Sequence, residues 1–199
     1  MERKVKDNHP GKGSITTVEP IRDTKDIQAI KTLLSENLRN LAYFTLGINS
    51  GIRAGDLLQL KVGQVRHLKV GETLAIREQK TKKMNGIVIN KAVHKVLKQY
   101  LDTENLQDND WLFMSQKGNS PLTVAAINHL IKSWTKSINL QGNYGAHSTR
   151  KTWAYHQRTK YGVSWELICN RLRHSSPAIT MRYLGIQSQE IANILLNEI

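Results

Sequence analysis

Hydrophobic side chains recur at helical spacing along most of the chain. The first apolar stripe comes directly after Asp23 and Thr24, and either side chain can cap the start of a helix. Gly51 would end the second helix. The stripe of the first helix consists of Ile27, Ile30, Leu33 and Leu34. The further helices that this spacing predicts lie at about 38–49, from Ala54 onward, around 93–101, and at about 123–138, 148–160, 164–173, 176–183 and 188–198.

The pattern changes near the middle of the chain. Residues 73–77 (TLAIR) and 86–89 (GIVI) have the composition of strands, and the polar run KTKKMN between them favours a hairpin turn. Helical spacing then resumes towards the C-terminus. The predicted fold class is therefore mainly α with a small antiparallel β-sheet.

The charge balance is unusual for a soluble protein. The chain has 29 Lys and Arg against 16 Asp and Glu, a net charge of +13. Such an excess favours a polyanion as partner, either nucleic acid or an acidic membrane surface. No apolar run approaches the roughly 20 residues that span a bilayer, and the polar N-terminus lacks the apolar stretch of a signal peptide. A reducing, cytoplasmic location is therefore expected.

The chain contains a single cysteine, Cys169. One cysteine excludes an intramolecular disulfide and any zinc site built from several cysteines. It lies in the apolar stretch 165–169, which favours a buried, inert thiol.

Two side chains near a predicted helix start have the chemistry to grip a phosphate. His147 and Arg150 are three positions apart and so share one helical face, close to backbone amide donors. The guanidinium supplies a two-pronged charged hydrogen bond, and the imidazole can donate or shuttle a proton. Alone, this spacing is a weak signal that chance often produces. The other candidates, each with an ordinary structural explanation when taken singly, are Arg53, Lys80, His174 and Tyr183.

Taken together and in this order, the candidates match a known family. The sequence resembles the catalytic domain of tyrosine recombinases, the phage-integrase-like proteins, over roughly residues 18–199. The segments GIRAGDLLQL, EQKTKKMN, HSTR, LRHSS and RYLGI look like the family's first arginine box, hairpin lysine, second box, third box and nucleophile segment. The resemblance implies catalytic roles for Arg53, Lys80, His147, Arg150, His174 and Tyr183, with Tyr183 as the nucleophile.

The resemblance also implies a reaction that needs no metal, ATP or other cofactor. The tyrosine would attack a DNA phosphodiester to give a 3′-phosphotyrosyl bond and a free 5′ hydroxyl. Arg53 and Arg150 would stabilise the charge that develops on the non-bridging oxygens, and His174 would hydrogen-bond the same phosphate. His147 would accept the phenol proton, and Lys80 would protonate the leaving 5′ oxygen.

One position departs from the family pattern. Arg173 stands before His174, where the family usually has glycine. If the backbone there needs a positive φ, an arginine costs on the order of 1 kcal/mol. If the position only limits bulk near DNA, Arg173 can reach a phosphate instead.

The expected partner is double-stranded DNA at a specific recombination site. Cations around the site would position the duplex through its backbone without reading its sequence. In the resembled family the C-terminal tail often docks on a neighbouring protomer and links a tetramer on DNA, whereas the free protein is compatible with a monomer. The cations predicted to bind DNA are Lys82, Lys83, Lys151 and Arg173.

The same evidence divides the chain into three parts. A basic linker or N-terminal arm covers residues 1–20, the catalytic domain covers 21–183, and a tail helix covers 184–199. The apolar stripe of the tail consists of Ile191, Ile194, Leu195 and Ile199.

Three other functions compete with recombination. A type IB topoisomerase shares the active-site logic, but the RYLG ending, the short tail and the small size favour a recombinase. A non-catalytic DNA-binding regulator of the same fold would not need the complete catalytic set. A basic scaffold or RNA-binding protein is disfavoured because the sequence has no aromatic stacking cluster or recognised RNA motif.

Overall fold

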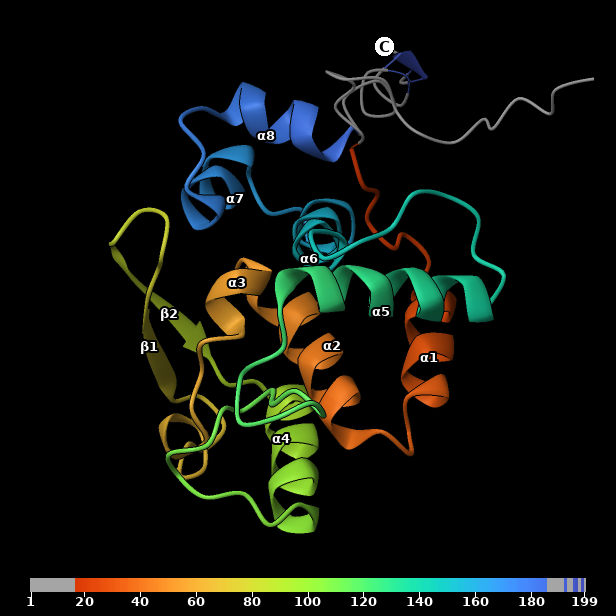
Figure 1. The fold of residues 1–199 in the computed structure, drawn as a ribbon. Coiled ribbons are helices and arrows are strands. Elements are labelled where there is room, and N and C mark those ends of the chain that lie inside the picture. The colour runs from red at the N-terminus through yellow and green to blue at the C-terminus, as the bar shows by residue number, and fades with distance from the viewer. Residues whose placement is uncertain (1–16, 186–191, 193–194, 197, 199) are drawn as a thin grey trace, which may run out of the picture.

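The computed structural model describes residues 17–185, 192, 195, 196 and 198. Within these residues the chain is mainly helical, and two strands pair into an antiparallel sheet, which confirms the predicted fold class (Figure 1). In chain order the elements are α1 (Thr24–Leu33), α2 (Leu38–Ser50), α3 (Ala54–Leu57), a 3₁₀ turn (Val62–Gln64), β1 (Thr73–Arg77), β2 (Met84–Val88), α4 (Lys91–Thr103), α5 (Val124–Ser137), α6 (Ser148–Thr159), α7 (Trp165–Leu172) and α8 (Pro177–Leu184).

Local sequence accounts for the ends of the first two helices. The side chain of Asp23 accepts a hydrogen bond from the backbone N–H of Lys25 and caps α1. Gly51 ends α2 with φ of 65°, and a Cβ at this position would come within 2.6 Å of the Trp153 ring. Both observations require glycine there. The predicted stripe of α1 is wrong for Leu33, which is 46% exposed because it lies at the edge of the packed face.

Strand pairing in the hairpin begins two residues earlier on the second strand than the sequence predicted. β2 begins at Met84 rather than at residue 86, because Met84 pairs with Arg77 and Asn85 with Ile76. The turn is therefore confined to residues 78–83, and Lys82 adopts a positive φ of 59° within it. This register brings the two strand ends close to the start of α3, where Asp56 accepts a hydrogen bond from the backbone of Gln79 at 2.9 Å.

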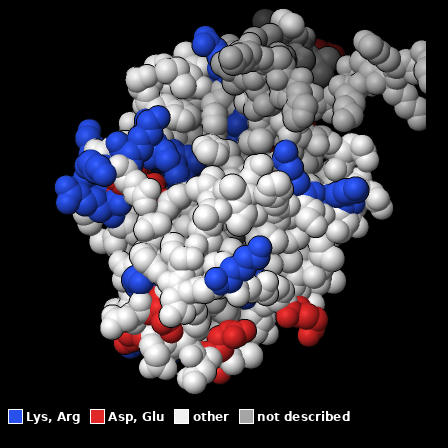
Figure 2. Space-filling model, viewed as in Figure 1, with Lys and Arg blue, Asp and Glu red and all other residues white. Residues whose placement is uncertain are grey.

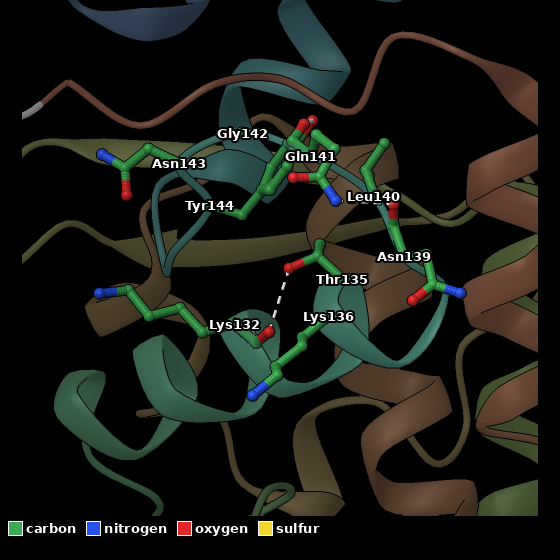
Figure 3. Close-up of a pocket in the computed structure, with 9 residues that line it drawn as sticks. All are labelled: Lys132, Thr135, Lys136, Asn139, Leu140, Gln141, Gly142, Asn143 and Tyr144. Atoms are coloured by element: carbon green, nitrogen blue, oxygen red, sulfur yellow. Dashed lines mark hydrogen bonds between the residues drawn. The ribbon is translucent and has the colours of Figure 1, made fainter.

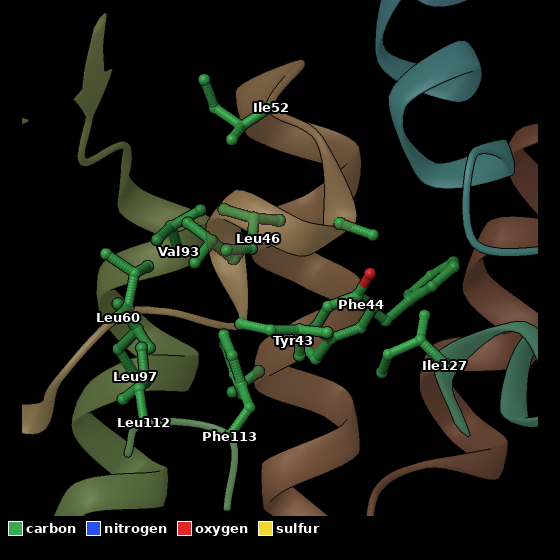
Figure 4. Packing of buried hydrophobic residues seen from close by; sticks show 14 of the residues in the cluster. Tyr43, Phe44, Leu46, Ile52, Leu60, Val93, Leu97, Leu112, Phe113 and Ile127 are labelled. Carbon is green, nitrogen blue, oxygen red and sulfur yellow. The ribbon is translucent and has the colours of Figure 1, made fainter. Parts of the chain in front are cut away.

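Two hydrophobic clusters hold the fold together. The larger joins α1–α5 and the hairpin, and at its centre the rings of Tyr43 and Phe113 meet edge-on with centroids 5.3 Å apart (Figure 4). Each large side chain buried in this way contributes roughly 1.5–3 kcal/mol. The smaller cluster joins α6, α7 and α8 and consists of Ala154, Trp165, Ile168, Leu172 and Leu184.

Helix α6 belongs to both halves of the molecule. It packs on α2 on one side and on α7 and α8 on the other (Figure 1). A site at the N-terminal end of α6 can therefore receive side chains from both clusters.

Residues 17–22, called the lead-in segment below, lie against α6 and the loop before it. The backbone of Glu19 donates to Asn143 O at 2.7 Å, and the backbone of Ile21 donates to Thr152 Oγ1 at 2.8 Å. Most of the predicted linker at 1–20 and most of the predicted tail helix at 188–198 lie outside the described residues. Both boundaries therefore remain predictions.

Two simpler expectations concern membranes and the cysteine. No helix in the described ranges is long and apolar enough to cross a membrane. Cys169 is a free thiol that is 5% exposed, which confirms the predicted burial.

Candidate active site

The start of α6 is fixed by the loop before it. Gly145 lies so close to Asn128 that an added Cβ would meet its side-chain oxygen, and the same oxygen accepts from the backbone of Ala146 at 3.1 Å. The hydroxyl of Ser148 accepts from the backbone of Gly145 at 3.1 Å. These contacts hold His147 at the N-cap position and Arg150 in the first turn of the helix.

Arg150 is a buried cation with unused hydrogen-bonding capacity. Its side chain donates from Nη2 to Leu172 O at 2.5 Å, and the residue is only 3% exposed. Its Nη1 is buried and has no hydrogen-bond partner among the described residues. Burial, followed by the charge of Arg53, lowers the pKa of Arg150 to about 10, so the guanidinium stays charged at neutral pH. An anion is the group that would satisfy this donor.

Arg53 reaches the site from the N-cap of α3. Its Nη1 lies 2.9 Å from Oε2 of Glu78, whose side chain has no exposed surface. The same carboxylate accepts from Thr81 Oγ1 at 2.7 Å and from Asn85 Nδ2 at 2.6 Å. Burial alone would raise the pKa of Glu78, but these hydrogen bonds and the Arg53 charge lower it overall. Glu78 thus ties Arg53 to the hairpin.

The hairpin lysines lie on the surface. Lys80, Lys82 and Lys83 are all exposed on the turn or next to it. Among the described residues, Lys80 is linked to Arg53 only indirectly, through its neighbour Thr81 and Glu78. On the face shown in Figure 2, basic side chains gather around the hairpin, and acidic ones lie towards the opposite end. The turn therefore presents positive charge beside the site.

His174 comes from the loop between α7 and α8. Its Nδ1 lies 2.9 Å from Thr180 Oγ1, and its ring meets that of Tyr183 edge-on with centroids 5.1 Å apart. Burial, followed by the charges of Arg150 and Arg53, lowers the pKa of His174 to about 4. The imidazole is therefore neutral at pH 7.

Tyr183 is brought to the two arginines within its own chain. It lies on α8, and its hydroxyl is buried without a hydrogen-bond partner in the described part of the chain. Burial raises the pKa of Tyr183 to about 12, while the charges of Arg150 and Arg53 act in the opposite direction. The phenol is thus protonated at neutral pH and lies in the field of both guanidinium groups.

His147 completes the predicted set at the edge of this cluster. The residue is exposed at the surface. The protein packed around its ring, followed by the charges of Arg150, Arg53 and Lys151, lowers the pKa of His147. A neutral imidazole at pH 7 can accept a proton.

Lys151 differs from its predicted place as a surface contact for DNA. The residue is 4% exposed, and its ammonium nitrogen lies 4.4 Å from the centroid of the Tyr183 ring. The reason is that position 151 of α6 faces the lead-in segment and the Tyr183 ring rather than solvent. Lys151 therefore does not lie on the free surface.

Arg173 resolves the two alternatives left by the sequence. It ends α7 with φ of 55°, so the backbone does take the left-handed conformation that favours glycine. Its side chain is exposed and donates from Nη2 to Met84 O at 2.7 Å, which joins α7 to the hairpin. The arginine therefore carries backbone strain and also lies beside the basic turn.

Sequence reasoning missed Glu78 and Thr180. Glu78 had a signal, because it follows Leu74 and Ile76 at strand spacing and so continues the inward face of β1 one residue past its end. A carboxylate at an inward position indicates a cationic partner. Thr180 had no comparable signal, since its contact with His174 depends on the angle between α7 and α8.

A cavity elsewhere in the molecule lies away from these residues. A pocket of about 560 Å³ lies between the C-terminal half of α5 and the loop 139–144, but none of the predicted site residues lines it (Figure 3). In the residues that the structure describes, no cluster of His, Cys, Asp and Glu could hold a metal ion. The cluster around Tyr183 is therefore the candidate site.

Comparison with known proteins identifies relatives of this chain. A profile of the phage integrase family matches residues 22–190. The probable integrase/recombinase YoeC of Bacillus subtilis (strain 168) is 36% identical over 172 residues, which make up 85% of this chain and 90% of YoeC. The tyrosine recombinase XerC of Caldanaerobacter subterraneus subsp. tengcongensis is 26% identical over 157 residues, covering 77% of this chain and 43% of XerC.

Solved structures share the fold at low sequence identity. XerA recombinase superposes with a TM-score of 0.72 and 22% identity, covering 91% of this chain and 67% of XerA. XerH bound to palindromic difH substrate, in a post-cleavage complex, gives a TM-score of 0.71 and 19% identity, covering 92% of this chain and 53% of the XerH chain. A dimer of lambda integrase residues 75–356 bound to a COC′ core site gives a TM-score of 0.60 and 18% identity, covering 87% of this chain and 62% of the chain in that structure. The chain thus spans most of YoeC but only about half to two thirds of these larger recombinases.

Proposed function

The chain belongs to the phage integrase family and is a tyrosine-type site-specific recombinase, and on this premise we propose that it cuts and rejoins DNA with Tyr183 as nucleophile. The observation that carries the proposal is the buried hydroxyl of Tyr183 in the field of Arg150 and Arg53. Nη1 of Arg150, which has no hydrogen-bond partner in the described part of the chain, supports a phosphate site at the same place.

The two arginines would act as the charge clamp of the reaction. Attack of the Tyr183 oxygen on phosphorus forms a phosphotyrosyl bond to the 3′ end and breaks the bond to the 5′ oxygen. Negative charge grows on the non-bridging oxygens during this step, and preorganised guanidinium groups stabilise it without reorganisation. Arg53 has five N–H donors and uses Nη1 for Glu78, so further donors remain for phosphate.

Protons would move through the neutral imidazole and the hairpin lysine. His147 accepts the phenol proton, because its lowered pKa keeps it neutral at pH 7. When Thr180 donates to Nδ1 of His174, the Nε2–H of that ring is free to donate to the phosphate. Lys80 is exposed on the β1–β2 turn, from which its ammonium would approach the leaving 5′ oxygen and protonate it.

Binding of DNA would place its backbone along the hairpin. Lys82, Lys83 and Arg173 are exposed around the β1–β2 turn and supply sequence-independent contacts to phosphates. The DNA-bound states of XerH and lambda integrase, which share the fold, support duplex DNA as the substrate. We propose that the protein acts on this DNA in the cytoplasm, at the nucleoid.

Strand exchange requires several protomers on DNA, and we propose a tetramer. Two copies bind the half-sites of one duplex, and two duplexes pair for exchange. Leu195 and Leu196 in the tail are 79% and 80% exposed, which supports docking of the tail on a neighbouring protomer.

Covalent capture on DNA tests the proposal. The protein is incubated with nicked duplex fragments of the source genome and denatured, and the DNA attached to it is sequenced. Recovery of one shared sequence at the covalent junction is expected, and the Tyr183→Phe variant should recover none. An adduct formed equally well by Tyr183→Phe would refute the assignment.

The captured sequence then separates recombination from relaxation. Two marked duplexes that carry it should exchange strands when incubated with the protein. Relaxation of a supercoiled plasmid without any exchange would instead indicate topoisomerase activity, and DNA binding without an adduct would indicate a regulator.

A further inference from the structure

A buried lysine lies against the nucleophile. The ammonium nitrogen of Lys151 is 4.4 Å from the centroid of the Tyr183 ring, and the residue is 4% exposed. A lysine is almost never buried without a partner, because transfer of its charge out of water is costly. The face of an aromatic ring is one partner that can compensate part of that cost.

The surroundings of Lys151 come from three elements. In the lead-in segment, Glu19 favours the charged ammonium and Arg22 disfavours it. On its own helix, the charge of Lys151 acts on His147. On α8 it meets Tyr183 itself. The lysine therefore lies between the lead-in segment and the nucleophile.

Apolar packing holds the Tyr183 ring against the smaller cluster, but it does not fix the direction of the hydroxyl. Its hydroxyl has no hydrogen-bond partner among the described residues, and its ring meets His174 only edge-on. Helix α8 belongs to the smaller cluster and contacts α6 and α7. A single directional contact with the ring face can thus decide how the phenol is aimed at Arg150.

We propose that Lys151 is a positioning residue whose charged ammonium holds the Tyr183 ring in the orientation that places its hydroxyl beside Arg150 and Arg53. This role rests on the proposed function of Tyr183 as nucleophile and adds to it a residue that does not touch DNA. When the ammonium loses its proton, the attraction to the ring disappears and Tyr183 is aimed less often.

The role predicts a defined dependence on pH. Burial, followed by opposing effects of Glu19 and Arg22, lowers the pKa of Lys151 to about 8. The ammonium is therefore charged below pH 7 and neutral above pH 9. The contribution of Lys151 to cleavage must be present at the lower pH and lost at the higher one.

The test compares single-turnover cleavage of a nicked duplex carrying the captured site between the wild type and Lys151→Met from pH 6.5 to 9.5. The ratio of the two rates cancels the titrating groups that Lys151 does not influence. His147, whose pKa Lys151 helps to lower, titrates in acid, so the decisive change in the ratio is the one between pH 7 and pH 9. We expect a ratio of about ten below pH 7 that falls to about one above pH 9. Lys151→Arg, which stays charged throughout, should retain its advantage over Lys151→Met at every pH.

Lys31 provides a matched control. It lies on α1, and burial lowers its pKa as well, but it is not near Tyr183. Lys31→Met should cleave like the wild type across the whole pH range. Thermal unfolding of each variant confirms that it is folded before its rate is compared.

The outcomes separate this inference from the proposed function. If the wild type forms no adduct, the proposed function fails. If the wild type cleaves but the ratio is one at every pH, or is large but independent of pH, Lys151 does not position the nucleophile through its charge. If Lys151→Met instead weakens duplex binding and lowers its salt dependence, Lys151 is a backbone contact and the inference is wrong.

Discussion

The guanidinium of Arg53 lies 2.9 Å from the carboxylate of Glu78, a side chain with no exposed surface. The pair joins the N-cap of α3 to the end of β1, and Glu78 also holds Thr81 and Asn85 of the hairpin. The orientation of a catalytic arginine thus depends on how the hairpin is folded. Contact of DNA with the turn can therefore change the orientation of Arg53 through the Glu78 carboxylate.

Replacing Glu78 should impair both stability and cleavage. Glu78→Gln keeps the shape but removes the charge that pairs with Arg53, and we expect the unfolding free energy to fall by about 1–3 kcal/mol. Cleavage of the captured site should slow by about tenfold, because Arg53 is no longer held in place. Urea unfolding and single-turnover cleavage measure the two effects. Normal cleavage by a folded Glu78→Gln protein would show that the pair does not orient Arg53.

The carboxylate of Glu78 should also make the stability of the protein depend on pH in the acid range. Hydrogen bonds and the Arg53 charge outweigh burial and hold the pKa of Glu78 below its ordinary value of 4.5. A carboxyl whose pKa is depressed by folding stabilises the protein above its unfolded pKa and loses that contribution as pH falls through its folded pKa. The stability difference between wild type and Glu78→Gln should therefore shrink below pH 4.5. A difference that is constant down to pH 3 would contradict this.

Loss of the nucleophile should not cost stability. The Tyr183 hydroxyl is buried with no partner among the described residues, so it contributes a desolvation cost without a compensating hydrogen bond. Tyr183→Phe should abolish the covalent adduct and leave the unfolding free energy equal to that of the wild type or about 1 kcal/mol higher. Chemical denaturation of both proteins measures the change. A marked loss of stability would reveal a partner for the hydroxyl.

Arg150 should be far less tolerant of substitution than its charge alone suggests. Arg150→Lys keeps a cation but loses the guanidinium fork, in which Nη2 donates to Leu172 O while Nη1 has no partner among the described residues. We expect cleavage to fall by about 10²–10³, the usual cost of one preorganised donor. Arg66→Lys is the matched control, since Arg66 is exposed and pairs with Asp108. That variant should cleave normally.

His174 should stay neutral well below neutral pH. Burial, then Arg150 and Arg53, lowers its pKa from 6.5 to about 4, so the unfolded chain binds a proton in this interval and the folded chain does not. The contribution of His174 to stability therefore falls as pH is lowered from 6.5 towards 4. NMR titration should give a midpoint near 4. A midpoint near 6.5 would mean that the ring is solvated.

Arg173 allows backbone strain to be separated from side-chain contacts. Both Arg173→Gly and Arg173→Ala remove the hydrogen bond to Met84 O, but only glycine relieves the positive φ of 55°. The glycine variant should be more stable than the alanine variant by about 1 kcal/mol. If Arg173 also contacts phosphate, both variants should bind duplex DNA more weakly, by the same factor. Different affinities for the two would indicate an effect of the backbone instead.

Much of this protein is already determined by its sequence. Helical spacing and the Asp23 and Gly51 end signals predict α1 and α2, because capping and positive φ depend on a few neighbouring residues. The ordered segments around Arg53, His147, Arg150, His174 and Tyr183 indicate the family, because the chemistry of phosphate transfer restricts the residue types at each of them.

The tertiary structure alone decided three other features: the pairing of Arg53 with Glu78, the burial of Lys151 against Tyr183, and the strained backbone of Arg173. The first two join residues that are far apart in the chain, so no local pattern reports them. Desolvation, which moves the pKa values of Lys151 and Tyr183 in opposite directions, is a property of the packed interior. The sequence therefore identifies the reacting groups, whereas their protonation states and orientations depend on how the chain packs.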